Sequence, residues 1–198
     1  MGAPPAAWWL DAYFRWLGRP YYLALASAAA AYGAGPQAIQ LVQVMTDRPR
    51  RALILGRIRV RFYVKREAAR TRVGELPGAH APLRVSTPEA TAIDLVRYAS
   101  SLGGIERAVE TLKPMAGRLK RSALKEALEA ENEPATAQRL GFILDGLGYH
   151  GLAETVERTL PARLARVRLD SGAKGSSREL RLHQRWELLV GELPFGTP

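Results

Sequence analysis

The stretch from Arg57 to Lys65 constrains the fold most, because apolar and polar side chains alternate along it without interruption. The even positions are all apolar: Ile58, Val60, Phe62 and Val64. The odd positions are polar or cationic: Arg57, Arg59, Arg61, Tyr63 and Lys65. Such alternation is typical of a strand with one buried face, so we expect a strand here whose outward side carries a row of cations.

Most of the chain's net positive charge is concentrated around this strand. The segment from Arg48 to Arg72 holds ten basic residues and one acid, Glu67, a net charge of +9, against +10 for the whole chain. A concentrated patch favours a polyanion or an acidic protein surface as the partner, and the alternative is a solvated face of an arginine-rich protein. The predicted nucleic-acid or partner-binding residues are Arg48, Arg50, Arg51, Arg57, Arg59, Arg61, Lys65 and Arg66.

The spacing of the row suits a nucleic-acid backbone. Same-face neighbours in a strand lie roughly 6.6 Å apart, close to the separation of successive phosphates on one strand. Contacts of this kind position a protein on duplex DNA but carry no sequence information.

The first half of the chain is predicted to combine strands with helices. We expect helices at 6–17 and 21–31, and strands at 39–46, 51–55, 57–65 and 83–85. Aromatic residues crowd the first helix, where core packing is favoured over a base-stacking platform. Ser86-Thr87-Pro88-Glu89 predicts a helix start, with Thr87 as N-cap before Pro88, or with Ser86 and Glu89 forming a capping box.

The second half is predicted to be mainly helical. Segments are expected at about 103–117, 120–132, 135–147 and 150–160, followed by a loop at 171–177 and an extended stretch at 178–190 that ends in an edge strand. The predicted class is therefore α+β: a small mixed sheet with flanking helices, then a helical lobe and a C-terminal return strand. We expect one domain over residues 1–198, with two lobes at about 1–85 and 86–198.

No enzyme signature is found in the sequence. His80, His150 and His183 have no second ligand at helical spacing, which disfavours a histidine metal site. Glu129, Glu131 and Glu133 are spaced like a two-metal acid pair, but alternate residues of a helix point apart, so a solvated helix end is favoured.

Two isolated acids have structural explanations. Asp47 is expected to cap a turn beside Arg48, and Asp94 to pair with Arg97 or a strand cation. We therefore predict a non-enzymatic protein with no metal and no cofactor.

Composition excludes other classes. The chain has no cysteine, which rules out disulfide scaffolds and thiolate chemistry. The longest apolar run, from Tyr21 to Tyr32, is too short to span a bilayer, and the N-terminus fits a signal peptide badly. We expect a cytoplasmic protein without a membrane partner.

Five blocks of sequence in order resemble the C-terminal domain of the AbiEi antitoxins, which belong to bacterial abortive-infection (type IV) toxin–antitoxin systems. The blocks are RPYYLALASAAA (19–30), VMTDRP (44–49), GRIRVRFY (56–63), LRVSTPEATAIDLVRY (83–98) and QRLGFIL (138–144). The resemblance extends from about residue 5 to 190, and STPEATAIDL is its most specific part.

The resemblance implies a role. Family members carry an N-terminal winged helix-turn-helix that binds the operator, and a C-terminal domain that opposes a nucleotidyltransferase-like toxin and adds DNA contacts. This sequence begins in what resembles the linker after the winged helix, which is expected of either a truncated form or a natural antitoxin-only version. The partners implied are a nucleotidyltransferase-like toxin and, through the basic strand, duplex operator DNA. The resemblance implies an antitoxin and regulator domain; the alternative is a DNA-binding transcriptional regulator without a toxin role.

Overall fold

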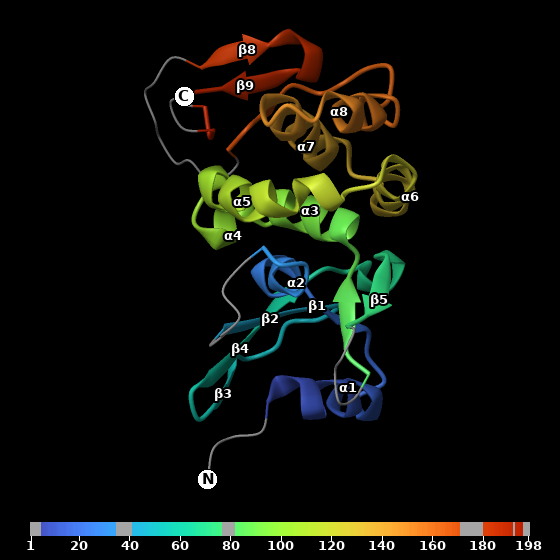
Figure 1. Ribbon diagram of the computed structural model, residues 1–198, viewed down its shortest axis with the longest axis vertical. Coiled ribbons are helices and arrows are strands. Elements are labelled where there is room, and N and C mark those ends of the chain that lie inside the picture. The colour runs from blue at the N-terminus through green and yellow to red at the C-terminus, as the bar shows by residue number, and fades with distance from the viewer. Residues whose placement is uncertain (1–4, 35–40, 77–81, 171–179, 192, 196–198) are drawn as a thin grey trace. The chain divides into compact units, whose positions relative to one another are not determined.

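A computed structural model describes residues 5–34, 41–76, 82–170, 180–191 and 193–195 of the chain. The chain forms two compact units, Met1–Thr91 and Ala92–Pro198. The first is built on a six-stranded mixed sheet, and the second on helices and a three-stranded sheet (Figure 1). The fold is α+β, which confirms the predicted class. No helix in the described part of the chain is long and apolar enough to cross a membrane.

The six-stranded sheet has the order β3-β4-β2-β1-β6-β5. Its strands are β1 Tyr21–Leu23, β2 Leu41–Thr46, β3 Leu53–Leu55, β4 Ile58–Val64, β5 Val73–Glu75 and β6 Arg84–Ser86. Strand β2 pairs parallel with β4 and antiparallel with β1, so the sheet is mixed. The β3–β4 hairpin turns at Gly56, whose φ of +59° favours glycine.

Two helices cover opposite faces of this sheet, α1 (Ala6–Trp16) on one and α2 (Leu25–Ala31) on the other (Figure 1). From α1, Leu10 and Phe14 are fully buried and join one core cluster with Val44 of β2 and Val60 of β4. The Phe14 ring also stacks on Tyr21, with 4.7 Å between ring centroids. Ile58, Val60 and Phe62 of β4 therefore face α1, as the alternation predicts, whereas Val64, which was predicted to be buried with them, is 38% exposed. A short 3-10 turn, η1 (Ala68–Arg70), follows β4.

The prediction of a helix from Tyr21 is wrong for its first residues. Tyr21–Leu23 form strand β1, and the helix begins only at Leu25. The alanine run favours a helix locally, but Tyr21 pairs with Thr46 of β2, and the β1 segment is buried between two neighbouring strands. Tertiary pairing thus outweighs the local helix propensity that the following alanines suggest.

Helix α3 (Pro88–Arg97) starts where the sequence predicts. The backbone N–H of Ala90 donates to Oγ1 of Thr87 at 3.3 Å, which identifies Thr87 as the N-cap with Pro88 as the first helical residue. The Ser86 hydroxyl instead lies 2.7 Å from the hydroxyl of Thr91. The first of the two predicted capping arrangements is confirmed.

Replacing Thr87 with alanine is expected to lower the free energy of unfolding by about 1 kcal/mol, because the N–H of Ala90 loses its acceptor. Thermal unfolding followed by circular dichroism measures the change. Thr111→Ala is the matched control: the Thr111 hydroxyl only donates to the Arg107 carbonyl within a helix, so its loss should leave stability nearly unchanged. Equal effects of the two substitutions would contradict the capping role.

The second unit contains five further helices and a small sheet among its described residues. The helices are α4 Ala99–Leu102, α5 Ile105–Leu112, α6 Arg121–Glu131, α7 Pro134–Gly146 and α8 His150–Glu157, with the 3-10 turns η2 Lys113–Arg118 and η3 Gln184–Trp186. The strands are β7 Val167–Arg168, β8 Arg181–His183 and β9 Leu188–Val190. The four predicted helical segments correspond to α5 with η2, α6, α7 and α8. The loop predicted at 171–177 lies outside the described residues.

The predicted C-terminal edge strand needs a correction. Strand β9 is the central strand of its own three-stranded sheet, with the order β7-β9-β8, and it does not return to the six-stranded sheet. It is buried because β7 and β8 flank it and because Trp186, just before it, is fully buried. The pairing of β9 with the distant β7 cannot be read from a local pattern.

Candidate functional site

The predicted basic surface is divided by the sheet. Val60 and Phe62 pack on the α1 side, so Arg59 and Arg61 project from the opposite face. Arg48, Arg50 and Arg51 lie in the β2–β3 loop, which contacts α1. The loop is fixed there by two contacts: Nη1 of Arg50 donates to the Tyr13 hydroxyl at 2.9 Å, and Nη1 of Arg19 donates to Asp47 at 3.1 Å.

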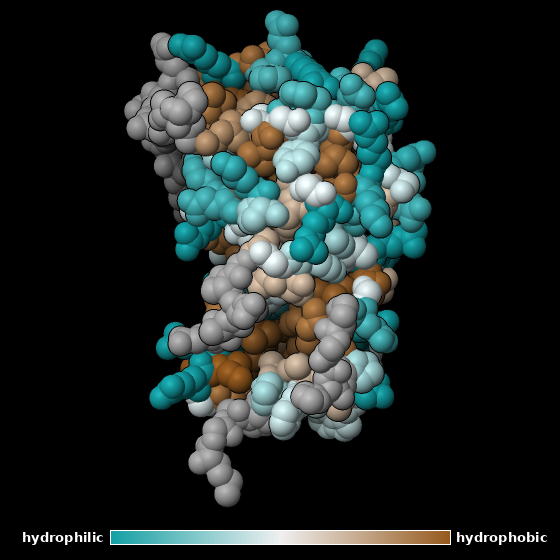
Figure 2. All heavy atoms as spheres, in the orientation of Figure 1, coloured by the Kyte–Doolittle hydropathy of each residue, from teal (hydrophilic) through white to brown (hydrophobic). Residues whose placement is uncertain are grey.

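The arginines that project from the face opposite α1 form, with two aliphatic residues, what we call the β4 surface: Arg57, Arg59, Arg61, Ile54 and Leu41. All three arginines are exposed. Arg59 pairs with Ile54 of β3 on one side and Leu41 of β2 on the other, so these side chains share a face. Ile54 is 70% exposed and Leu41 40%. Figure 2 shows hydrophobic and strongly hydrophilic side chains side by side where Figure 1 places the β3–β4 hairpin.

The predicted cation row ends at Arg61, because Tyr63 and Lys65, which follow on that face, are both buried. Tyr63 is buried, and its hydroxyl accepts from Nε2 of Gln43 at 3.2 Å. The side-chain carbonyl of Gln43 accepts the backbone N–H of Ala26 in α2 at 2.8 Å. Lys65 is only 1% exposed, with its ammonium 5.9 Å from the centroid of the Tyr22 ring. Lys65 therefore does not lie on a solvent-facing row, whereas Arg66, just after the strand, is exposed.

The three arginines of the β2–β3 loop differ in their exposure. Arg48 and Arg51 are exposed, and Arg50 is half-buried, with its guanidinium carbon 5.4 Å from the Phe14 ring centroid. Beside it, Trp16 at the end of α1 is 80% exposed. Core packing of the α1 aromatics is therefore confirmed for Phe14 but wrong for Trp16, and also for Trp8, which is 55% exposed.

The acids considered as catalytic candidates take part in structural contacts. Asp47 accepts from Arg19 and does not serve only as a turn cap. Arg97 pairs with Glu131 and Glu133, at 3.6 and 3.4 Å, so its charge is shared with α6 and the start of α7. The Glu131 side chain is 5% exposed, which corrects the expectation of a solvated helix end. Asp94 is fully buried.

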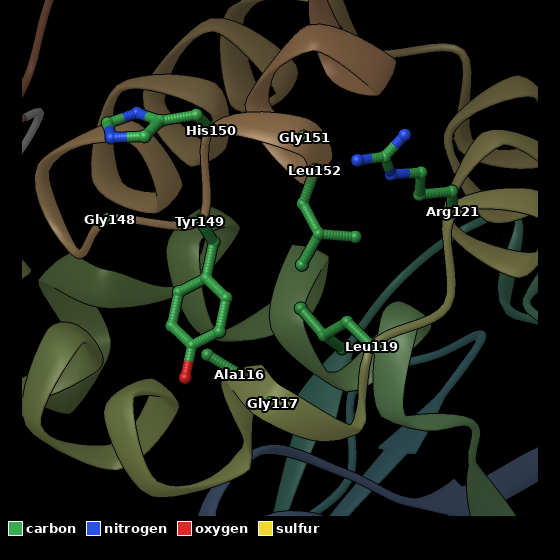
Figure 3. Close-up of a pocket in the computed structure, with 9 residues that line it drawn as sticks. All are labelled: Ala116, Gly117, Leu119, Arg121, Gly148, Tyr149, His150, Gly151 and Leu152. Carbon is green, nitrogen blue, oxygen red and sulfur yellow. The ribbon is translucent and has the colours of Figure 1, made fainter.

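A hollow of about 440 Å³ in the second unit offers no catalytic constellation. It is lined by Tyr149, Arg121 and the start of α8 (Figure 3). The His150 ring extends away from Leu119 and Leu152 in that view, and its Nδ1 lies 2.8 Å from Oδ1 of Asp145. No group of three or more metal-ligating side chains occurs in the part of the chain that the structure describes.

Two pKa shifts have structural causes outside the basic surfaces. Burial, together with the hydrogen bond to Asp11, raises the pKa of Tyr21 well above its ordinary value of 10. Burial acts to raise the pKa of Asp145, but the hydrogen bond from His150 and the charge of Arg185 outweigh it and lower that pKa overall. Tyr21 therefore stays protonated and donates to Asp11, and Asp145 stays ionised and accepts from Arg185.

Two exposed apolar residues of the β4 surface were missed at the sequence level. Ile54 lies within an apolar run, Leu53–Leu55, in which nothing indicates that the middle residue faces outward. The strand register with Arg59 provides that information, since residues paired across two strands share a face. Leu41 was missed for the same reason.

Comparison with known proteins places the chain in a family. The model of the AbiEi antitoxin C-terminal domain matches residues 22–146, well over half of the chain. The fold is similar to that of the RV2827C protein from Mycobacterium tuberculosis, with a TM-score of 0.64 and 17% identity. The alignment covers 91% of this chain and 66% of that one, so this chain spans just under two thirds of that protein's length. No curated protein matches the sequence.

Proposed function

We propose that this chain, which belongs to the AbiEi antitoxin family by the match over residues 22–146, opposes a nucleotidyltransferase-like toxin without catalysing a reaction. In this proposal the β4 surface docks onto an acidic surface of the toxin.

The mixture of arginine and exposed aliphatic side chains on the β4 surface carries the proposal. Protein interfaces are enriched in arginine and bury an apolar centre, whereas a surface that only contacts phosphates gains nothing from an exposed isoleucine. Ile54 lies directly opposite Arg59, and the two would be buried together by one partner. An exposed aliphatic side chain directly beside a row of arginines is therefore best explained by a protein partner.

Duplex DNA remains the second candidate partner, because the chain's positive charge is so concentrated. If about six phosphates were contacted, log K would fall with log salt at a slope near −5. The division of the arginines between the two sides of the sheet works against so large a continuous footprint: β4 contributes Arg59 and Arg61, and the hairpin turn contributes Arg57. A slope of about −3 or shallower is what the β4 surface could supply.

The test is growth rescue. Expression of the toxin candidate encoded beside this chain should arrest growth, and co-expression of this chain should restore it. The purified pair should then elute together in size-exclusion chromatography. Failure to rescue, with folded soluble chain confirmed by circular dichroism, would overturn the antitoxin role. Rescue without a complex would overturn the docking while keeping the role.

A further inference from the structure

An exposed aromatic side chain lies beside a cationic loop at the end of α1. Trp9, Tyr13 and Trp16 follow one stripe of the helix, with ring centroids 6.1 Å apart for the first pair and 6.4 Å for the second. Exposure is greatest at Trp16, at 80%. The Arg50 hydrogen bond to Tyr13 and the Arg19 pair with Asp47 hold the β2–β3 loop against this end of the helix.

Cations outnumber acids at the end of α1 and in the β2–β3 loop. The cations are Arg15, Arg19, Arg48, Arg50 and Arg51, and the acids nearby are Asp11 and Asp47. Both acids are engaged, Asp11 with Arg15 at 2.8 Å and Asp47 with Arg19 at 3.1 Å. This leaves the three arginines of the loop without a compensating acid among these residues. The loop reaches the exposed indole through Tyr13, which Arg50 contacts and whose ring centroid lies 6.4 Å from that of Trp16.

We propose that Trp16 and Tyr13, with Arg48, Arg50 and Arg51, bind an unpaired stretch of nucleic acid. A base stacks on the exposed indole, and the loop arginines contact the flanking phosphates. This site is independent of the antitoxin role, because it lies on the α1 side of the sheet, opposite the face that carries Arg59 and Arg61.

The arrangement favours a single strand over a duplex. Aromatic stacking needs the flat face of a base, which a base inside a duplex does not expose. Cations beside an aromatic platform are the combination by which proteins hold single strands without reading their sequence. The half-buried Arg50, held by the Tyr13 hydroxyl, supplies a pre-oriented charge. The positive charge therefore favours a polyanion as the ligand, and the exposed indole ring favours a single-stranded nucleic acid over a duplex.

The test uses the full chain and a fluorescein-labelled, unstructured oligonucleotide of roughly 12 nucleotides, as RNA and as DNA, with binding followed by anisotropy. Trp16→Ala should weaken binding about 5- to 150-fold, the equivalent of roughly 1–3 kcal/mol for one stacked base. Trp16→Phe, which keeps an aromatic face, should retain most of the affinity. Replacing Arg48 and Arg51 with alanine should make the salt slope shallower by about 1.4.

Trp8→Ala is the matched control, since Trp8 is an exposed tryptophan of the same helix, about two turns before Trp16. It should change the affinity less than about twofold, a change under about 0.5 kcal/mol. Three outcomes would overturn the proposal: Trp16→Ala binding as tightly as the unsubstituted chain, a duplex of the same sequence binding as tightly as the single strand, or a self-associated chain in sedimentation that Trp16→Ala dissociates. The last would assign Trp16 to contact with a second copy.

Discussion

A chain with alanine at Arg57, Arg59 and Arg61 is expected to lose growth rescue and to bind the toxin at least about 100-fold more weakly. Hydrogen bonds to charged groups contribute about 1.5–3 kcal/mol each, so two lost contacts account for this factor. All three side chains are exposed, and the short strand β3 at the sheet edge leaves room for a partner beside them. The measurement is the dissociation constant by isothermal titration calorimetry, alongside the rescue assay.

The fold should tolerate the triple substitution. Exposed cations contribute little to stability. Arg61 makes one contact that the substitution removes: its guanidinium carbon lies 5.1 Å from the Tyr63 ring centroid. Tyr63 keeps its hydrogen bond from Gln43 in the variant. We expect the free energy of unfolding to change by less than about 1 kcal/mol.

The control removes the same charge elsewhere. Arg107, Arg118 and Arg158 are exposed residues of the second unit, and alanine at all three lowers the net charge equally. If this control weakened binding as much as the β4-surface variant, attraction to the chain's overall charge would explain the result. Ile54→Asp further separates docking on the β4 surface from attraction to the overall charge. It should abolish toxin binding because it places an acid within the interface, whereas binding through long-range charge would weaken only modestly.

Period-2 alternation predicted strand β4 well, but burial along the strand depends on distant residues. The apolar side of β4 faces the core because the pleat alternates, which the sequence states directly. Whether the other side meets water depends on α2, whose position is set by the Gln43 bridge to Ala26 and Tyr63. Lys65 is buried against Tyr22 of β1, a residue distant in the sequence, and so its burial could not be predicted from its own neighbours.

The division of the basic residues between two sides of the sheet also depends on structure that a local pattern does not show. A charge count over 48–72 treats the arginines as one patch, but a hairpin and a loop within that segment send them to opposite sides of the sheet. The start of α3 could be placed beforehand, with Thr87 as one of two candidate caps, because an N-cap depends on the next three residues only. Features set by neighbouring residues, such as a helix start or strand alternation, were thus predictable, and the surfaces assembled from several strands were not.

Gly141→Ala is expected to destabilise the second unit by about 3 kcal/mol, at the upper end for an overpacked core. A Cβ built on Gly141 would lie 2.2 and 2.3 Å from two ring carbons of Trp186, closer than atoms can approach. Trp186 is fully buried, so its ring has no space to move into. Its backbone is also held, because Nε2 of Gln138, one turn earlier in α7, donates to the Trp186 carbonyl at 2.8 Å.

The sign of this effect is the informative part. Alanine normally stabilises a helix relative to glycine by about 1 kcal/mol, so a destabilised Gly141→Ala isolates the contact with Trp186. Gly117→Ala is the matched control: its Cβ would meet the Tyr149 hydroxyl oxygen at 3.6 Å, an ordinary contact, and stability should stay level or rise.

A smaller ring, Trp186→Phe, combined with Gly141→Ala should recover part of the loss in a double-mutant cycle. Thermal unfolding should show Gly141→Ala lower in Tm by about 6–12 °C. A Tm equal to or above that of the unsubstituted chain would mean that Trp186 does not pack on Gly141, and the close approach of η3 to α7 would then be wrong.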